Sequence, residues 1–482
     1  MTLNHRFSVT AGLTLALLMT SGLSCTTAHK KPDSALPGPA ASATKPSELQ
    51  NLGINLDLQK RTLSNGLTVL MVEDHTVPVI SYQSWFKVGS VDERPGITGI
   101  AHLFEHLMFK GTPKYGAKEF FLQLEARGAS VNAYTTRDYT VYHETFTPNL
   151  TDRVIDMESD RMAHLTLNEE AFKTERQVVF EERRLRTDNS PGGRVQEALW
   201  ALAYHTHPYS WPVIGYPEDL GRMTVEDLKK FFATYYQPGN ATIVIVGDFK
   251  TDLMFEKIKK AYGGIAGHKR SKRDIPEEKE QNEERRLVLY DQVATERLSL
   301  AYHASGAEND DSYALDVLAN VLFAGTNSRG HQKLVEEMQI ASDVSGVAYT
   351  PTYPGLFMMT ATMKGKHVAT EAEARLEALV RDIQLKGVTE EEIRFAVRQL
   401  TVQVVDSVRT AHGLGTLIGT VQMVFDDPQR FAEDLAKYLK VTSDDVKRVA
   451  NQYLLPNHRS VVTLKPGSLP GVPAPAAKEG AE

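Results

Sequence analysis

Cysteine is nearly absent from this sequence, which has a single one, Cys25, among 482 residues. One cysteine excludes an internal disulfide and a cysteine-rich metal site, so any bound metal must be held by His, Asp or Glu. Long basic tracts are lacking too, and 54 basic against 61 acidic side chains give a net charge of -7. This balance argues against a nucleic-acid partner.

Extreme composition is also lacking. Hydrophobic residues make up 41% of the chain and charged residues 24%, as in ordinary soluble globular proteins. These fractions exclude a chain that is disordered throughout, a collagen-like repeat and a protein with many membrane spans. At roughly 150 residues per domain, the length predicts two or three domains.

The N-terminus has the pattern of an export signal. Arg6 precedes an apolar stretch, Phe7 to Leu18, that is too short for a convincing membrane span. The stretch Gly22-Leu23-Ser24-Cys25 is similar to a bacterial lipoprotein signal, although Gly22 stands where leucine is more common. We therefore expect residues 1–24 to be a signal peptide and Cys25 to be lipidated, with a plain secretory signal as the alternative.

Either signal predicts an exported protein. Thr26, directly after the cysteine, does not signal inner-membrane retention. We therefore expect a periplasmic protein that is attached to the outer membrane through a lipid at Cys25.

Changes in composition along the chain predict its organisation. Pro, Ala, Ser and Thr dominate the segment after Cys25, an almost wholly polar run switches from basic to acidic near the middle, and the end is rich in Pro, Ala and Gly. We expect a flexible tether over 25–54, an N-terminal domain over 55–265, a solvated charged linker over 266–286, a C-terminal domain over 287–465 and a disordered tail over 466–482.

Local patterns in the first domain predict several elements. A turn at Ser64-Asn65-Gly66 between apolar runs indicates a hairpin. Residues 129–146 alternate as two paired strands would, 151–187 are a long helical stretch, and 241–249 contain a buried strand.

The two halves have the pattern of a weak repeat. Alignment of Gly111 with Gly325 places LFEHLMFKGT (103–112) against VLANVLFAGT (317–326). The apolar positions match, whereas the polar positions of the first segment are not kept in the second. We therefore expect the second half to keep the packing of this helix without its chemistry.

The first segment carries a pattern that is typical of a metal site. His102 and His106, four residues apart, project from one face of a helix, so their nitrogens can converge on one tetrahedral Zn²⁺. Glu105 can reach a metal-bound water and take its proton. This is the HExxH arrangement of other zinc peptidases, reversed along the chain. The alternative is an ordinary polar surface helix, but both histidines lie in an otherwise apolar run.

Two histidines hold a catalytic zinc poorly, so a third ligand is needed. Glu175 and Glu182 are two helical turns apart and share a face, while Glu181 is turned by about 100° from Glu182. One member of the pair can bind zinc and the other can support it. Spacing alone does not choose between them.

The sequence strongly resembles the M16 metallopeptidases, the family of pitrilysin, insulinase and mitochondrial processing peptidase. The resemblance covers about 55–465 and matches the shorter, two-domain members. It rests on the following motifs: Gly89-Ser90-Val91-Asp92-Glu93, Gly96-Ile97-Thr98-Gly99-Ile100-Ala101, HLFEHLMFKGT, Asn132-Ala133-Tyr134-Thr135, Glu175 with Glu182, His207-Pro208-Tyr209, Val213-Ile214-Gly215, Tyr235 to Ala241 and Gly247-Asp248-Phe249.

The resemblance implies a role for each matching residue. It makes His102, His106 and Glu182 the ligands of one zinc per chain, Glu105 the general base and Glu175 a supporting acid. It also implies an α+β fold of two homologous domains, each an antiparallel-rich sheet covered by helices on one face. Two such halves, or four in a dimer, would enclose a chamber that admits peptides or unfolded segments.

Substrate contacts are implied as well. Asn132 and Ala133 lie where the family has an edge strand that pairs with an extended peptide, with a turn or strand-end residue as the alternative reading of Asn132. Active members also place an Arg and a Tyr from the C-terminal half near the substrate. Arg409 is the candidate arginine, yet no tyrosine lies between Tyr353 and Tyr438. This departure predicts a heterodimer with a non-zinc homologue, a homodimer being the alternative.

Three functions remain to be separated. The leading hypothesis is a zinc endopeptidase of the cell envelope. The second is a non-catalytic structural or assembly subunit, although such members typically have eroded ligands. The third is a peptide-binding or chaperone-like receptor, which would bind without turnover and without a metal.

Overall fold

The computed structural model describes residues 8–11, 14–17, 57–268 and 272–467. Strands β1 (Ser8–Ala11) and β2 (Thr14–Leu17), paired antiparallel, lie within the predicted signal peptide. Cys25, the tether up to residue 54 and the tail from residue 468 lie outside the described residues. No helix within the described ranges has the length and apolar character needed to span a membrane.

The N-terminal half is a six-stranded sheet with helices. The sheet order is β3-β4-β8-β5-β7-β6, in which only β4 and β8 pair in parallel. Its strands are β3 (Leu58–Thr62), β4 (Thr68–Glu73), β5 (Ile80–Phe86), β6 (Ser130–Thr135), β7 (Thr140–Phe146) and β8 (Ala241–Gly247). Its helices are α2 (Ile100–Leu107), α3 (Glu119–Glu125), α4 (Thr151–His164), α5 (Glu169–Arg183), α6 (Pro191–Ala203), α7 (Pro217–Arg222), α8 (Val225–Tyr235) and α9 (Thr251–Tyr262).

Sequence and structure agree on the hairpin and on the strand pair. The turn at 64–66 joins β3 to β4, and residues 129–146 form the antiparallel pair β6–β7. The predicted long helical stretch over 151–187 is wrong in one respect, because it is broken between α4 and α5. Asn168 begins the second helix as its N-cap, with its side chain accepting from Ala171 N.

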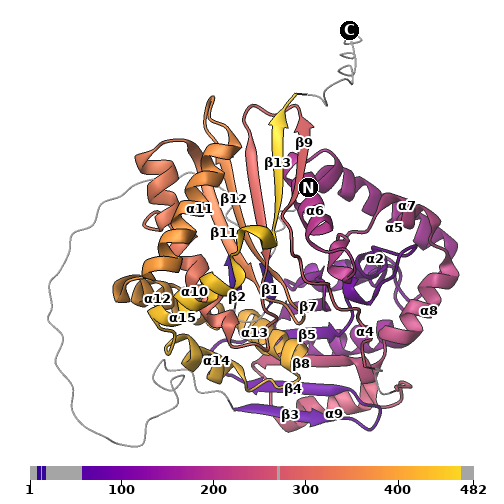
Figure 1. The fold of residues 1–482 in the computed structure, drawn as a ribbon. Helices are drawn as coiled ribbons and strands as arrows, with labels where there is room; N and C mark the ends of the chain where they lie inside the picture. The colour runs from indigo at the N-terminus through magenta and orange to yellow at the C-terminus, as the bar shows by residue number, and fades with distance from the viewer. Residues whose placement is uncertain (1–7, 12–13, 18–56, 269–271, 468–482) are drawn as a thin grey trace, which may run out of the picture.

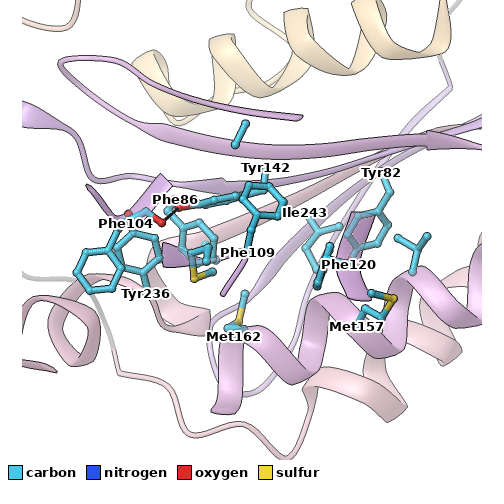
Figure 2. Packing of buried hydrophobic residues seen from close by; sticks show 14 of the residues in the cluster. Tyr82, Phe86, Phe104, Phe109, Phe120, Tyr142, Met157, Met162, Tyr236 and Ile243 are labelled. Atoms are coloured by element: carbon cyan, nitrogen blue, oxygen red, sulfur yellow. Dashed lines mark hydrogen bonds between the residues drawn. The ribbon is translucent and has the colours of Figure 1, made fainter. Parts of the chain in front are cut away.

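The main core of this half lies between the sheet and its own helices. Figure 2 shows Phe104 of α2 packed near Phe86 and Tyr236. The Phe104 and Tyr236 rings are stacked with centroids 4.9 Å apart. Alternate residues of one strand serve two cores: Met71 of β4 faces these helices, whereas Leu70 belongs to a second cluster on the opposite face of the sheet.

The C-terminal half repeats this plan with five strands. The order is β11-β12-β10-β13-β9, with β13 and β9 parallel. Its strands are β9 (Arg285–Asp291), β10 (Arg297–His303), β11 (Ala341–Tyr349), β12 (Leu356–Met363) and β13 (Arg459–Pro466). Its helices are α10 (Asp311–Phe323), α11 (Ala369–Lys386), α12 (Glu390–Ser407), α13 (Ala411–Phe425), α14 (Phe431–Tyr438) and α15 (Ser443–Tyr453). Two α+β halves are thus confirmed.

Each half also contributes one helix to the other half, which the sequence does not predict. In Figure 1, α13 lies over β5 and β8 of the N-terminal sheet, and α6 lies beside β13 of the C-terminal sheet. Leu414 and Ile418 of α13 share a cluster with Val244, and Leu199 of α6 shares one with Val462. Helices therefore cover both faces of each sheet rather than one.

Most described residues of the solvated linker predicted over 266–286 are exposed, but a few of them make buried contacts that the sequence does not predict. Arg273 is buried and forms an ion pair with Asp92 at 2.6 Å. Gln281 is also buried and donates to Arg459 O at 2.7 Å. Strand β9 begins at Arg285, inside the predicted linker. The charged run thus joins both halves through buried contacts.

Candidate metal centre

Helix α2 presents His102, Glu105 and His106 because its start is fixed by buried groups. Gly99 precedes the helix with φ +90°, a conformation that favours glycine. The buried carboxylate of Glu93 accepts from Gly99 N at 2.8 Å and from Ala101 N at 2.9 Å. Burial raises the pKa of Glu93 well above its ordinary value, ahead of the opposing effect of these two bonds. Glu93 therefore satisfies amides that the helix itself leaves unpaired.

A neighbouring loop locks the same helix end. A Cβ on Gly99 would lie 2.5 Å from Ile214 O, and a Cβ on Gly215 would lie 2.2 Å from Thr98 O. Asp219 of α7 accepts from the Thr98 hydroxyl at 2.7 Å. These close backbone contacts explain why the motifs around 96–101 and 213–215 contain glycine, and they fix the direction in which α2 leaves the loop.

Helix α5 brings the third carboxylate to α2. Glu182 Oε2 lies 3.3 Å from His106 Nε2 and 3.7 Å from His102 Nε2. Glu175 instead lies beside the other ring nitrogen, with Oε2 3.5 Å from His106 Nδ1. The packing of α5 on α2 thus separates two glutamates that spacing alone left equivalent.

The three donor groups fit a single zinc ion. His102, His106 and Glu182 offer one atom each, all within 4.8 Å of one another, and they form the one such group among the described residues. Zn–N and Zn–O bonds of about 2.0–2.2 Å at tetrahedral angles place ligand atoms roughly 3.3–3.6 Å apart. The two distances from Glu182 Oε2 lie at or close to that separation. A His₂Glu set is one that catalytic zinc sites use.

The electrostatics of the group suit a cation. Burial lowers the pKa of His102, which keeps its imidazole neutral. Burial also lowers the pKa of His106, but the facing carboxylates of Glu175 and Glu182 outweigh it and raise that pKa to about 9. Burial raises the pKa of Glu182, yet His106, His102 and Arg186 outweigh it and lower it to about 2. The carboxylate is therefore ionised, and positive charge is favoured between it and the rings.

Glu105 faces the end of the edge strand. Thr135, the last residue of β6, donates its hydroxyl to Glu105 Oε2 at 2.8 Å. Glu105 does not belong to the three-residue donor group. Its role in proton transfer stays a prediction.

Three supporting contacts were missed by the sequence reasoning. Thr135 holds Glu105, Lys110 Nζ lies 2.5 Å from Glu175 Oε1, and Arg186 Nη1 lies 2.6 Å from Glu182 Oε1. The Glu182–Arg186 pair has the i,i+4 spacing of helical ion pairs, a signal that could have found it. The others join segments far apart in the chain and leave no local pattern.

The predicted substrate residues lie on different parts of the molecule. Asn132 and Ala133 are in β6, the edge strand of the sheet, opposite His143 and Tyr142 of β7. Their position at the edge is confirmed, whereas contact with a peptide stays a prediction. Arg409 lies between α12 and α13 with an exposed side chain that pairs with Asp406 at 3.5 Å. Its predicted role also stays untested.

Within the described residues, the C-terminal half keeps the helix but has no candidate metal group. Helix α10 follows β10 and precedes the β11–β12 pair, as α2 follows β5 and precedes β6–β7. The alignment places Asp316, Ala319 and Asn320 against His102, Glu105 and His106. Asp316 is buried and accepts from the Tyr438 hydroxyl at 2.5 Å. Its carboxylate thus serves packing within this half.

Protein-family models match most of the folded chain. The model described as "Insulinase (Peptidase family M16)" matches residues 68–216, which include α2 and α5. The model described as "Peptidase M16 inactive domain" matches residues 222–400. The second match covers most of the half that lacks the histidine motif.

Curated relatives and solved structures agree with these matches. The chain is 32% identical to "Zinc protease PqqE" of Helicobacter pylori over 410 residues, 84% of this chain and 92% of the relative. It is 23% identical to "Uncharacterized zinc protease YmxG" of Bacillus subtilis, over 86% and 100% of the two chains.

Among solved structures, a protease from Helicobacter pylori matches with a TM-score of 0.81 and 31% identity, over 85% of this chain and 100% of the other. A peptidase M16 inactive domain from Pseudomonas fluorescens matches with a TM-score of 0.78 over 86% and 98%, but at 17% identity it supports the fold alone. The candidate metal group on α2 and α5 and the paired α+β halves agree with these relatives, and the chain belongs to peptidase family M16.

Proposed function

We propose that this protein is a zinc-dependent endopeptidase of the bacterial cell envelope that hydrolyses peptides or unfolded protein segments. The observation that carries the proposal is the group on α2 and α5, where Glu182 Oε2 faces Nε2 of both histidines. The zinc-protease names of its relatives support the same chemistry. The envelope location rests on the N-terminal sequence.

His102, His106 and Glu182 would hold the metal. When bound, zinc supplies a Lewis acid that brings the pKa of a coordinated water to about 7. Glu105 accepts a proton from the attacking water and passes it to the leaving amine. Thr135 holds one oxygen of Glu105, which directs the carboxylate during this transfer. Glu175 orients His106 from its Nδ1 side.

Strand β6 is the element that we expect to hold the substrate. It is the last strand of its sheet, and its end contacts Glu105 through Thr135. An extended peptide that pairs with Asn132 and Ala133 would lie beside the catalytic groups through backbone hydrogen bonds, which require little of its sequence. This geometry favours unstructured substrates.

A partner chain is part of the proposal. Arg409 pairs with Asp406 on the surface, and the C-terminal half offers no tyrosine between Tyr353 and Tyr438. We expect a non-zinc homologue to complete the substrate site, with a homodimer as the alternative. Cleavage by the purified chain alone, at rates normal for zinc peptidases, would contradict the need for a partner.

A structural subunit is the second candidate function. The match to a model described as an inactive domain favours it. That match, however, covers residues 222–400, whereas the metal group lies within the part that matches the insulinase model. Zinc content together with chelator-sensitive cleavage separates the two functions.

The Glu105→Gln variant tests the enzyme proposal. We expect it to keep about one zinc per chain, because Glu105 is outside the donor group. We expect kcat to fall at least about 100-fold, since a general base contributes roughly 10²–10⁴. Peptide cleavage is measured with the partner present where one is needed, and Glu181→Gln, an exposed glutamate of α5, is the control. Unchanged kcat in Glu105→Gln would remove Glu105 as the base.

A further inference from the structure

The two oxygens of the Glu182 carboxylate face different partners. Oε2 faces the two imidazoles, as described above, whereas Oε1 lies 2.6 Å from Arg186 Nη1. One oxygen is therefore directed to the candidate metal position and the other to a guanidinium. The second contact is an ion pair with the i,i+4 spacing of helical ion pairs.

The backbone that carries Arg186 is held from several sides. It lies in a π-helical segment (Arg184–Asp188) that directly continues α5, and such turns are frequent at functional sites. A Cβ on Gly193 of α6 would lie 2.1 Å from Arg186 O. The preceding Arg183 is buried and contacts Glu197 at 2.7 Å and Gly215 O at 2.9 Å. These contacts fix the position from which Arg186 reaches Glu182.

We propose that Arg186 is a positioning residue that keeps Glu182 a one-oxygen ligand and so preserves an open coordination position. This inference rests on the proposed function and deepens it. A catalytic zinc with three protein ligands holds water in its fourth position and needs an open fifth position when it expands in the transition state. A carboxylate that binds through both oxygens would occupy that fifth position and make the site five-coordinate at rest, and a guanidinium on Oε1 prevents this.

An ordinary surface ion pair is the competing explanation, because most such pairs contribute little. The same helix offers a comparison in the pair of Arg184 with Glu181, whose side chains are 57% and 66% exposed. Arg186 and Glu182 are 34% and 15% exposed. Only the second pair includes a member of the metal group, so the two pairs separate a general electrostatic effect from an effect on the metal.

Cobalt substitution tests the inference without using activity. Full-length wild type, Arg186→Gln, Arg186→Lys and the control Arg184→Gln are loaded with Co²⁺, whose visible absorption is stronger in four-coordinate than in five-coordinate sites. We expect strong absorption in wild type and Arg184→Gln, weaker absorption in Arg186→Gln and partial recovery in Arg186→Lys. Zinc affinity, measured by competition with a chelator, should stay within about tenfold of wild type, and kcat in Arg186→Gln should fall about 10- to 100-fold.

The results of the cobalt experiment distinguish failure of the Arg186 inference from failure of the proposed function. A wild-type spectrum in Arg186→Gln would overturn the inference and leave the proposed function standing. Loss of metal from Arg186→Gln would also overturn it, because Arg186 would then be needed to hold Glu182 at all. If circular dichroism shows that Arg186→Gln does not fold, the cobalt spectra of Arg186→Lys and the control Arg184→Gln are compared instead. Weaker absorption in Arg186→Lys would support the inference, and equal absorption would overturn it. Failure of the wild type to bind Zn²⁺ or Co²⁺ would instead contradict the proposed function.

Discussion

At the scale of single residues, the choice of the third ligand depends on three-dimensional contacts. The spacing of His102, Glu105 and His106 is sufficient to predict a metal helix, because positions four apart share a face. Glu175 and Glu182 also share a face, so spacing leaves them equivalent. The structure separates them, since Glu182 faces Nε2 of both rings and Glu175 faces Nδ1 of one.

Substitution of Glu182 tests that separation. We expect Glu182→Gln to lose most of its zinc, because a neutral amide replaces an ionised ligand, and we expect Glu175→Gln to weaken binding less, by about 10- to 100-fold. Zinc content and competition titration measure both effects. The control is Glu181→Gln, whose side chain is 66% exposed and pairs with Arg184. Equal loss in all three variants would contradict the assignment.

At the scale of elements, local sequence signals predict the secondary structure of a segment better than its tertiary contacts. The β3–β4 hairpin and the β6–β7 pair follow from turn residues and alternation. The break before α5 was missed, although Asn168 followed by Glu169 and Glu170 is a helix-start signal. The buried anchor of the mostly exposed linker is not predicted, because Asp92, which pairs with Arg273, is far away in the sequence.

Two glycines with positive φ allow a test of how the metal helix is fixed. Gly99 has φ +90° and Gly128 has φ +83°, but a Cβ meets Ile214 O at 2.5 Å only at Gly99 and meets nothing within 4 Å at Gly128. Both alanine variants carry a left-handed strain of about 1–2 kcal/mol. We expect Gly99→Ala to lower the free energy of unfolding by about 1–3 kcal/mol more than Gly128→Ala does. We also expect it to weaken zinc binding, because the clash displaces α2.

Chemical denaturation and zinc titration of Gly99→Ala and Gly128→Ala measure these effects. Equal stability of the two variants, with equal zinc affinity, would show that the contact between Gly99 and the 213–215 loop does not position the helix.

At the scale of the whole molecule, the exchange of α6 and α13 makes the two halves depend on each other. The sequence predicts two α+β halves, and the structure and its relatives confirm them. It does not predict the exchange, because an apolar helix face does not indicate which sheet covers it. The exchange also brings His412 of α13 against His143 of β7, with ring centroids 4.5 Å apart.

This histidine contact predicts a pH dependence of stability. Burial, and secondarily His412, lowers the pKa of His143 to about 3, and burial lowers the pKa of His412 as well. The unfolded chain therefore binds more protons than the folded chain between about pH 6.5 and 3. The stability that comes from keeping the buried histidine neutral is fully present above that window. It is lost as the pH falls through the window, by up to about 1.4 kcal/mol of unfolding free energy per pH unit for one group.

When the pH falls from 7 to 5, we expect the free energy of unfolding to decrease less in His143→Gln than in wild type. The difference between the two decreases should be about 2 kcal/mol. Urea unfolding at the two pH values measures the difference. The control is His164→Gln, on a side chain that is 64% exposed. The same pH dependence in wild type and His143→Gln would show that this contact does not sense acid.

The proposed enzyme depends most on one metal bound between α2 and α5. Zinc-edge anomalous diffraction from crystals of the zinc-loaded protein locates that metal directly. We predict one peak per chain, between the Nε2 atoms of His102 and His106 and Oε2 of Glu182. A zinc peak elsewhere in the chain, or none in loaded crystals, would contradict the account.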